Sequence, residues 1–303
     1  MIENATPIAT LLPGRGLLRL DGAEVGAFLQ GLVSNDTTLL TPRHALFCAL
    51  LTPQGKFLHE LIIADTGDGL LIDTEEARKT DLQRRLTLYR LRARIGIAAP
   101  EDHVVAVAFG DGVAARFGLA GEAGTARPLD GGGAVFVDPR KDALGVRLLG
   151  PRAVVEAALT AAGLALTEGE AAWDRHRLRL GVPDGSRDIA VDRGFLLENN
   201  FEELNGVSFT KGCYVGQELT ARTKHRGTIR KKLMTVEFDP SAPAPAPDTT
   251  ILFGGHDAGA MRTAVPGVGL AMIRLEYLDP AEGEDHVFTA DGLVLRPVAP
   301  TGA

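Results

Sequence analysis

The order of apolar and polar residues predicts a mixed region of helices and strands, followed by a region of strands only. Two apolar runs of strand length, 45–51 and 57–64, flank the segment 52–56, which contains a proline and a glycine. Because these residues favour a tight turn, we expect a β-hairpin. Apolar residues recur at helical spacing over 82–89, whereas short apolar runs separated by turn residues follow Lys232. The pattern predicts a small β-barrel or sandwich at the C-terminal end.

Other helix signals lie in the first part of the chain. Asp73 and Glu76 have the spacing of a capping box, which predicts that a helix begins there. Glycine and proline at a segment's end, or proline in its first turn, are typical helix boundaries. On these grounds we expect further helices at 23–32, 151–162 and 168–180.

Composition restricts the class of protein. The chain has 303 residues, of which 45% are apolar, so it can form two or three domains with packed cores. Its net charge of −7 argues against a general nucleic-acid coat, so any anion site must be local. Cys48 and Cys213 are far apart and form no disulfide framework. With no signal peptide or membrane span in the sequence, we expect a protein of the reducing cytoplasm.

The segment 211–218 carries the strongest chemical signal. Cys213 follows Lys211 and Gly212, and a helix expected over 214–222 would place the thiol near a helix N-terminus. Backbone N–H groups there favour an anion, and hence the reactive thiolate. Cys213 is therefore a candidate for covalent, redox or metal chemistry, although burial as a small apolar residue is the alternative. Cys48, inside an apolar run, is expected in the core.

A basic run follows the cysteine. No acidic residue occurs between Leu219 and Val236. The run favours an anion site, for which the phosphate of RNA and the glutamate tail of a folate are candidate ligands, although an exposed helix end is the alternative. Few aromatic residues accompany it, which weakens the case for a single-strand nucleic-acid platform. Its members are Arg222, Lys224, His225, Arg226, Arg230, Lys231 and Lys232.

The motif Lys-Gly-Cys-Tyr-x-Gly-Gln-Glu at 211–218, followed by Ala221-Arg222 and Arg226-Gly227, resembles the signature of YgfZ-type proteins. These are folate-binding relatives of the glycine-cleavage T-protein, an aminomethyltransferase, and they include mitochondrial iron–sulfur assembly factors. The resemblance extends over most of the chain, in blocks at 28–31, 34–36, 51–56, 88–92, 138–140, 144–147, 177 and 181–183.

This resemblance implies an α+β, three-lobed fold of the GcvT/YgfZ type, with two mixed α/β lobes around a central hole and a C-terminal β-barrel. The expected first lobe combines residues 1–45 with 135–230 and carries the cysteine motif. The second lobe spans 46–134, and the barrel spans 231–303. In the family, the central hole is where a folate can bind.

The resemblance also implies a cofactor, tetrahydrofolate or a derivative. Cys213 and Lys211 are the expected catalytic residues. We expect no metal site, because no second cysteine lies nearby and no histidines are spaced as a metal pair. The expected cofactor-binding residues lie in the motif and just after it: Lys211, Gly212, Tyr214, Gln217, Glu218, Arg222 and Arg226.

Alignment with the T-protein shows departures at its functional positions. Asp73 stands where the T-protein has an asparagine, and Thr80 falls nearest to its aspartate for aminomethyl transfer, with Asp81 one residue away. Arg147 and Trp173 stand at the positions of a glutamate and an arginine that hold folate. These departures argue against aminomethyltransferase activity and leave the pose of a folate open.

The leading hypothesis is a folate-binding accessory protein for the assembly or repair of iron–sulfur clusters, with a linked role in tRNA modification. Its expected partners are folate and iron–sulfur assembly proteins or client enzymes, without a membrane. One alternative is a tetrahydrofolate-dependent aminomethyltransferase. Another is a protein that binds tRNA directly, which the acidic net charge makes the weakest reading.

Overall fold

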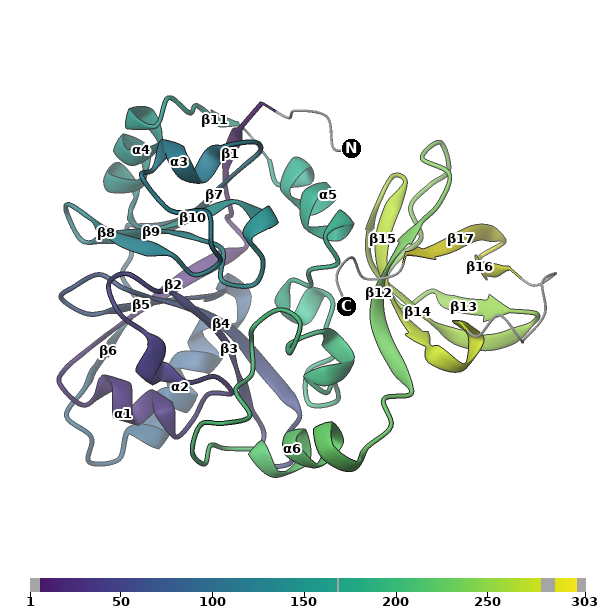
Figure 1. Cartoon of the computed structure of the whole chain (residues 1–303), viewed down its shortest axis with the longest axis horizontal. Helices are drawn as coiled ribbons and strands as arrows, with labels where there is room; N and C mark the ends of the chain where they lie inside the picture. The colour runs from purple at the N-terminus through teal and green to yellow at the C-terminus, as the bar shows by residue number, and fades with distance from the viewer. Residues whose placement is uncertain (1–5, 168, 279–286, 299–303) are drawn as a thin grey trace.

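Two stacked β-sheets and a separate β-barrel make up the protein (Figure 1). The computed structural model describes residues 6–167, 169–278 and 287–298. Helix α5 (Ala171–Arg179) lies between the stacked sheets and the barrel. Within these ranges, no helix is both long and apolar enough to cross a membrane. The expected α+β fold, with mixed lobes and a C-terminal barrel, is confirmed.

The first sheet has five antiparallel strands in the order β3-β4-β5-β2-β6. Its strands are β3 (Leu46–Leu51), β4 (Phe57–Asp65), β5 (Leu70–Glu75), β2 (Arg15–Asp21) and β6 (Gly96–Ala98). Strands β3 and β4 form the predicted hairpin. Side chains alternate between the faces of a sheet, so one face packs on helices α1 (Val25–Gln30) and α2 (Lys79–Arg90) and the other meets the second sheet.

The second sheet has six strands in the order β11-β1-β7-β10-β9-β8. Its strands are β11 (Leu166–Thr167), β1 (Ile8–Leu11), β7 (His103–Phe109), β10 (Val146–Pro151), β9 (Gly133–Val137) and β8 (Ala126–Leu129). Helices α3 (Val113–Arg116) and α4 (Arg152–Ala161) cover its outer face. The inner face contributes Phe136 and Val107 to the core shared with the first sheet.

Strand pairing divides the first part of the chain differently from the lobe ranges that the resemblance implies. Strand β2 pairs with β5 and β6, so residues 15–21 belong to the same sheet as 46–98. Strand β1 pairs with β7, so residues 8–11 belong with 103–151. The lobe boundaries stay a prediction. The first sheet is formed by strands within residues 15–98, and most of the second is formed by strands within 103–151.

The barrel is closed by six strands in the order β12-β15-β14-β13-β16-β17. They are β12 (Lys231–Glu237), β15 (Val268–Arg274), β14 (His256–Val265), β13 (Thr250–Phe253), β16 (Phe288–Ala290) and β17 (Leu293–Val298). Strand β14 was not predicted, because its Gly259 and short side chains give a weak apolar signal. Gly259 sits where a Cβ atom would overlap the carbonyl oxygen of Met272, so close strand packing requires glycine here.

The predicted helix start at Asp73 is wrong. Asp73 lies inside β5, on the same inner face as Leu71, and the helix α2 begins only at Lys79. The capping-box spacing arose by chance, because the carboxylate binds side chains of other strands. Its Oδ1 accepts from Nε of Arg15 on the neighbouring strand β2 at 2.7 Å, and its Oδ2 accepts across the sheets from Nη1 of Arg147 at 2.6 Å. These long-range partners are invisible in a local pattern.

Paired charges occupy the core between the two sheets. Arg147 of β10 is fully buried and contacts Asp73 of the opposite sheet. At 3.3 Å it also contacts Asp138, which directly follows β9. Arg140 contacts Asp138 at 2.8 Å. Burial alone would raise the pKa of Asp138, but Arg140 and Arg147 stabilise its carboxylate and hold that pKa at about 2. The sheets are therefore joined by charged groups that are buried and paired.

We predict that Arg147→Met lowers the free energy of unfolding by about 3–5 kcal/mol, because it leaves buried carboxylates short of a partner. Urea denaturation measures this change. Arg152→Met is the matched control: Arg152 makes an exposed pair with Glu156, and its loss should cost less than about 1 kcal/mol. Equal stability of the two variants would contradict a joining role for Arg147.

Candidate functional site

The loop 207–216 carries the cysteine and is held against the first sheet by contacts at its beginning and at its end. At its start, Gly206 packs on the rings of Phe47 and Phe201, which stack with centroids 4.8 Å apart. A Cβ atom at Gly206 would approach Phe201 to 2.5 Å, so only glycine fits. The loop runs to helix α6 (Gln217–Arg226), which lies at the foot of the molecule (Figure 1).

Lys211 anchors this loop through its buried ammonium group. Its Nζ donates to the carbonyl oxygens of Val33 at 2.8 Å and Asn35 at 2.7 Å. Burial lowers the pKa of Lys211 to about 8. The residue thus binds the chain segment after α1 rather than facing solvent. Its expected catalytic and folate-binding roles stay predictions, and two of its donors are already engaged inside the protein.

Tyr214 is the second anchor. Its ring is buried, with its centroid 5.0 Å from the Lys211 ammonium, a distance at which a cation is attracted to an aromatic face. Burial raises the pKa of the Tyr214 hydroxyl, opposed by a hydrogen bond with Thr220 of α6. Next to it, the backbone N–H of Val215 donates to the carbonyl oxygen of Gly31 at 3.2 Å. Lys211 and Tyr214 are therefore anchored inside the protein, and the two residues between them, which include Cys213, are held in place.

Gly216 explains why the cysteine motif and the hairpin turn occur together. Its φ of 81° suits glycine, and a Cβ atom here would lie 2.5 Å from the carbonyl oxygen of Thr52 and 3.0 Å from the Cα of Gly55. Gly55 has a φ of 73°, and a Cβ atom there would lie 2.9 Å from the carbonyl oxygen of Gly216. The two backbones therefore touch, and each glycine is required by the other.

Cys213 lies between these anchors and is exposed. The predicted helix over 214–222 begins later than expected, at Gln217, so the thiol precedes the helix by a short loop and is not in its first turn. A Cβ atom at neighbouring Gly212 would meet nothing within 4 Å. Cys48, by contrast, is fully buried in the core, as expected, and burial raises the pKa of its thiol to about 12.

The remaining expected cofactor residues do not converge with Cys213. Glu218 and Arg222 form an exposed ion pair of 2.7 Å along α6. Gln217 is the first residue of that helix, and Arg226 is its last, with a side chain that lies outside the part of the chain that the structure describes. Their roles in binding folate stay predictions, and no described contact links them to Lys211 or the thiol.

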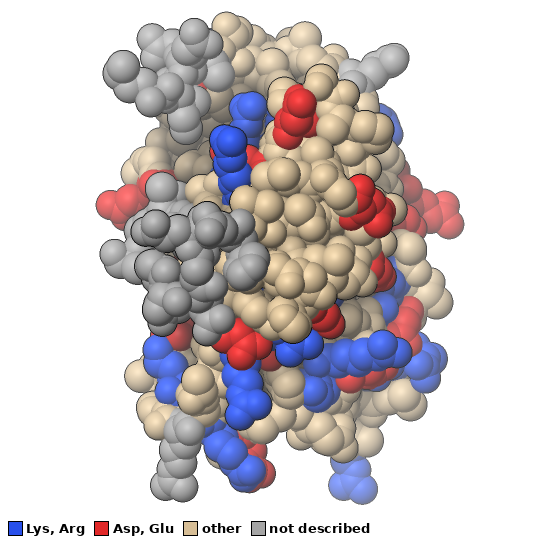
Figure 2. Space-filling model, turned by 90° about the vertical axis from the view of Figure 1, so that its right-hand side faces the viewer, with Lys and Arg blue, Asp and Glu red and all other residues tan. Residues whose placement is uncertain are grey.

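Glutamates from the segment 198–203 neutralise much of the basic run. Arg222 pairs with Glu218 within the helix. The other contacts are Lys224 with Glu202, Lys232 with Glu203, and Lys231 with Glu198 at 3.5 Å. Figure 2 shows this mixture as blue side chains interleaved with red ones below the barrel. The expected anion site thus loses much of the charge on which it rested.

The aligned transferase positions are engaged in structural contacts. Asp81 accepts from Arg84 and Arg85 at 2.7 Å and lies 3.0 Å from Nε2 of His59. Partial burial would raise the pKa of Asp81, but these hydrogen bonds hold that pKa well below its usual range. Burial lowers the pKa of His59 to about 4. Thr80 lies beside it in α2. A carboxylate with three protein partners is poorly placed to accept a substrate proton.

The folate-holding positions are likewise filled by protein contacts. Arg147 is bonded to Asp73 and Asp138, and Trp173 packs in the core with its ring centroid 5.7 Å from the Arg147 guanidinium. A folate could not reach either residue without separating buried ion pairs. The residues present therefore do not fit a folate bound in the pose of the transferases.

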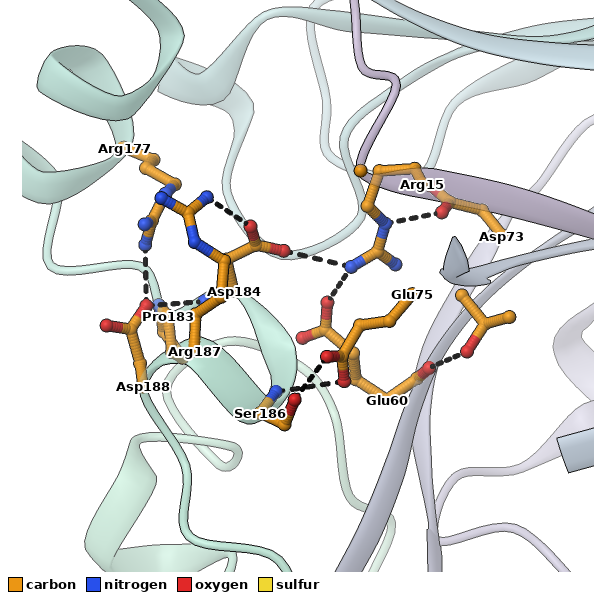
Figure 3. Close-up of polar contacts among 12 residues, drawn as sticks. Arg15, Glu60, Asp73, Glu75, Arg177, Pro183, Asp184, Ser186, Arg187 and Asp188 are labelled. Atoms are coloured by element: carbon orange, nitrogen blue, oxygen red, sulfur yellow. Dashed lines mark hydrogen bonds and ion pairs between the residues drawn. The ribbon is translucent and has the colours of Figure 1, made fainter. Parts of the chain in front are cut away.

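The sequence did not predict a second set of buried charges, which lies next to the ion pair of Arg147 and Asp73 (Figure 3). Arg15 contacts Glu60 and, at 2.9 Å, Asp184 in the segment after α5. Arg177 of α5 contacts Asp188 of the same segment at 2.7 Å. The signal that could have found them is a charged residue at an inward position of a strand or helix. Their function is to hold the segment 183–188 against the first sheet.

Two pockets lie away from Cys213. One, of about 940 Å³, opens between the two sheets and is lined by Arg15, Lys79 and His103 among others. The other, of about 1080 Å³, lies between the barrel and the linker that precedes it, and Phe195 and Arg230 line it. Among the described residues, no group of three or more metal-ligating side chains comes together.

We predict that Gly216→Ala lowers the free energy of unfolding by about 2–3 kcal/mol, because of its positive φ and its contact with the hairpin turn. Gly212→Ala is the matched control from the same loop: its Cβ atom meets open space, and we expect a change within about 0.5 kcal/mol. Thermal or urea unfolding compares them. A tolerated Gly216→Ala would show that the two backbones can separate.

Comparison with known proteins agrees with this architecture. Residues 230–303 match the model of the CAF17 C-terminal beta-barrel domain. The chain is 34% identical to the iron-sulfur cluster assembly factor IBA57, mitochondrial, of Homo sapiens, over 93% of this chain and 80% of that protein. It is 31% identical to the same factor of Mus musculus, over 95% and 82%.

Among solved structures, the glycine cleavage system aminomethyltransferase T from Bartonella henselae shares the fold, with a TM-score of 0.77. The match covers 98% of this chain and 86% of that one, at 16% identity, which shows the fold alone. The expectation of a cytoplasmic protein is contradicted, because the similar assembly factors are mitochondrial. Identity over nearly the whole length places this chain in the family of the iron–sulfur cluster assembly factor IBA57.

Proposed function

We propose that this protein is an accessory factor of iron–sulfur cluster assembly that presents the thiol of Cys213 to a partner protein. The observation that carries the proposal is an exposed thiol on a loop whose neighbours Lys211 and Tyr214 are both buried. The names of the related assembly factors support the same process.

A thiol on a fixed loop suits contact with a partner better than chemistry in a closed cavity. Iron–sulfur clusters are held mainly by cysteine thiolates, and one cysteine supplies only one ligand. Cys48 cannot add a second, because it is fully buried and burial raises the pKa of its thiol to about 12. The other ligands, or the receiving thiol, would belong to the partner. Anchoring of the loop reduces the entropy lost when the two proteins meet.

Aminomethyl transfer is disfavoured by the same geometry. Asp73 and Arg147 bind one another across the sheets, and Asp81 is occupied by His59 and two arginines. Direct tRNA binding is disfavoured because four glutamates pair with the basic run. A role in tRNA modification would then be indirect, through modifying enzymes that carry iron–sulfur clusters.

A second candidate function, folate binding, is favoured by the pocket of about 1080 Å³ beside the barrel. Its size suits a drug-sized ligand. The ring of Phe195 lines the pocket and has one face covered by the Lys56 ammonium group, 3.2 Å from its centroid. Arg230 is exposed without an ion pair among the described residues. A folate has a planar ring system and a glutamate tail, so this pocket offers a partner for each, away from the engaged transferase positions.

We predict that Cys213→Ser fails to restore iron–sulfur enzyme activity in a strain lacking this protein, while its melting temperature stays unchanged, because only an exposed sulfur is lost. Cys48→Ala is the matched control, since it removes the other thiol from the core, and it should restore activity. The measurement is the activity of an iron–sulfur enzyme in extracts. Full restoration by Cys213→Ser would exclude the proposed role.

We predict that tetrahydrofolate binds saturably in calorimetric titration, that Arg230→Glu weakens this binding about tenfold through lost charge attraction, and that no aminomethylated carrier is turned over. Arg43→Glu changes another exposed arginine, on a loop of the stacked sheets, and should bind as the unaltered protein does. Binding that is absent, or indifferent to Arg230→Glu, would rule out this pocket.

A further inference from the structure

The C-terminal end of α2 exposes large apolar side chains to solvent. Leu91, which follows the helix, is 88% exposed, and Leu88 is 64% exposed. Tyr89 lies between them in sequence and is also exposed. Scattered apolar residues are normal on a surface, but three within four positions form a patch. We name Leu88, Tyr89, Arg90, Leu91 and Arg92 the α2 patch.

Leu91 adopts a backbone conformation that leucine disfavours. It ends α2 with a φ of 46° and a ψ of −105°, in the region where glycine is the usual residue. A side chain in this conformation costs free energy, and an exposed leucine gains little from packing to offset it. The exposed leucine is therefore unexplained by the stability of this chain alone.

Unpaired positive charge gathers at the same place. Five arginines occur between positions 84 and 94, and no acidic residue occurs from 82 to 100. Asp81 pairs with Arg84 and Arg85, and Glu24 pairs with Arg94. Arg92 is exposed and has no ion pair within the described ranges. Five arginines face two acidic partners, so this segment keeps a surplus of positive charge in a protein of net charge −7.

Helix α1 connects the α2 patch to the cysteine loop. At the N-cap of α1, Glu24 accepts from the backbone N–H of Arg94 at 2.9 Å. At the C-cap, Gly31 accepts from the backbone N–H of Val215. Six helical residues rise about 9 Å, so one end of this short helix lies at Arg94, two residues after the patch, and the other lies at the loop. Figure 1 shows α1 and α2 together on the outer face of the first sheet.

We propose that the α2 patch is a docking surface for an acidic segment of a partner protein, one that places an apolar side chain against Leu88 and Leu91 and carboxylates against Arg90 and Arg92. Arginine and aromatic residues are enriched at such interfaces. A standard interface covers about 800 Å² on each partner, enough to include both the patch and the Cys213 loop. The inference rests on the proposed function, because it assigns where the partner of the thiol is held.

A protein partner fits these observations better than a lipid surface. Three apolar side chains beside a few arginines give a small patch, and membrane anchoring needs a larger apolar area or a second anchor. The remainder of the protein is acidic and would be repelled by an anionic membrane. An acidic protein segment needs only local complementarity, which Arg92 and its neighbours supply.

The test uses a short fluorescein-labelled peptide in which leucines are spaced among glutamates, with anisotropy as the readout and the full-length protein as receptor. We expect saturable binding that Leu91→Ser and Arg92→Glu each weaken about tenfold. Replacing the peptide's leucines by alanine, or its glutamates by lysine, should have a similar effect. Leu252→Ser and Arg43→Glu are matched controls, since they change an exposed leucine and an exposed arginine elsewhere, and they should bind normally.

Leu91→Gly separates docking from folding. Glycine adopts the positive φ readily, so the melting temperature should not fall, while peptide binding should weaken as in Leu91→Ser. Absence of peptide binding, or binding equal in all variants, overturns the proposal. Patch-dependent binding to phosphatidylserine vesicles without peptide binding overturns it in favour of a membrane. A dimer in sedimentation that Leu91→Ser dissociates overturns it in favour of a second copy of the chain.

Two readouts distinguish this proposal from the proposed function. Cys213→Ser should bind the peptide normally, because the thiol lies beyond the patch. If peptide binding depends on Leu91 and Arg92 but Cys213→Ser still restores enzyme activity, the role of the thiol is wrong and the docking surface stands. If Cys213→Ser fails to restore activity but the patch variants bind and restore activity normally, the docking surface is wrong and the thiol's role stands.

Discussion

The ion pair between Arg147 and Asp73 joins two sheets that otherwise meet through apolar side chains. Buried charges are stable only when partnered, so each sheet is held in the one register that brings its charge to the other. Arg15 shares Asp73 and extends the network to Asp184, which lies in the segment leading toward the cysteine loop. The position of the loop 207–216 therefore depends on buried charges in the core between and beside the sheets.

That dependence changes the meaning of the cysteine motif. Lysine, tyrosine and glycine around a thiol suggest an activated active site, but here Lys211 binds backbone carbonyls, Tyr214 fills the core and Gly216 touches Gly55. Most residues of the motif hold the loop in place through contacts inside the protein, and Cys213 is exposed to solvent. The fold is shared with an aminomethyltransferase, whereas the sequence relatives are iron–sulfur cluster assembly factors, so the fold alone does not determine the function.

Local pattern predicted the elements that local chemistry determines. The hairpin around 52–56 and the strand-only C-terminal part follow from turn residues and alternation, and both are confirmed. Pattern failed where distant segments decide. Asp73 resembled a helix cap because its partners lie in other strands, and the basic run after Cys213 resembled an anion site because its glutamates lie at 198–203. The resemblance to a family predicted the barrel and a role in iron–sulfur cluster assembly. It did not predict which side chains are engaged in contacts inside the protein.

The anchoring of the loop 207–216 has a chemical consequence for Cys213. The loop is pinned by Lys211 and Tyr214 on either side of Cys213, and the thiol between them is exposed. An exposed thiol that reaches the thiolate form is open to oxidation through sulfenic acid to irreversible products. Protection must then come from outside the chain, either from cellular reductants or from a bound partner. If a partner binds at this thiol, as proposed, oxidation of Cys213 is fastest when that partner is scarce.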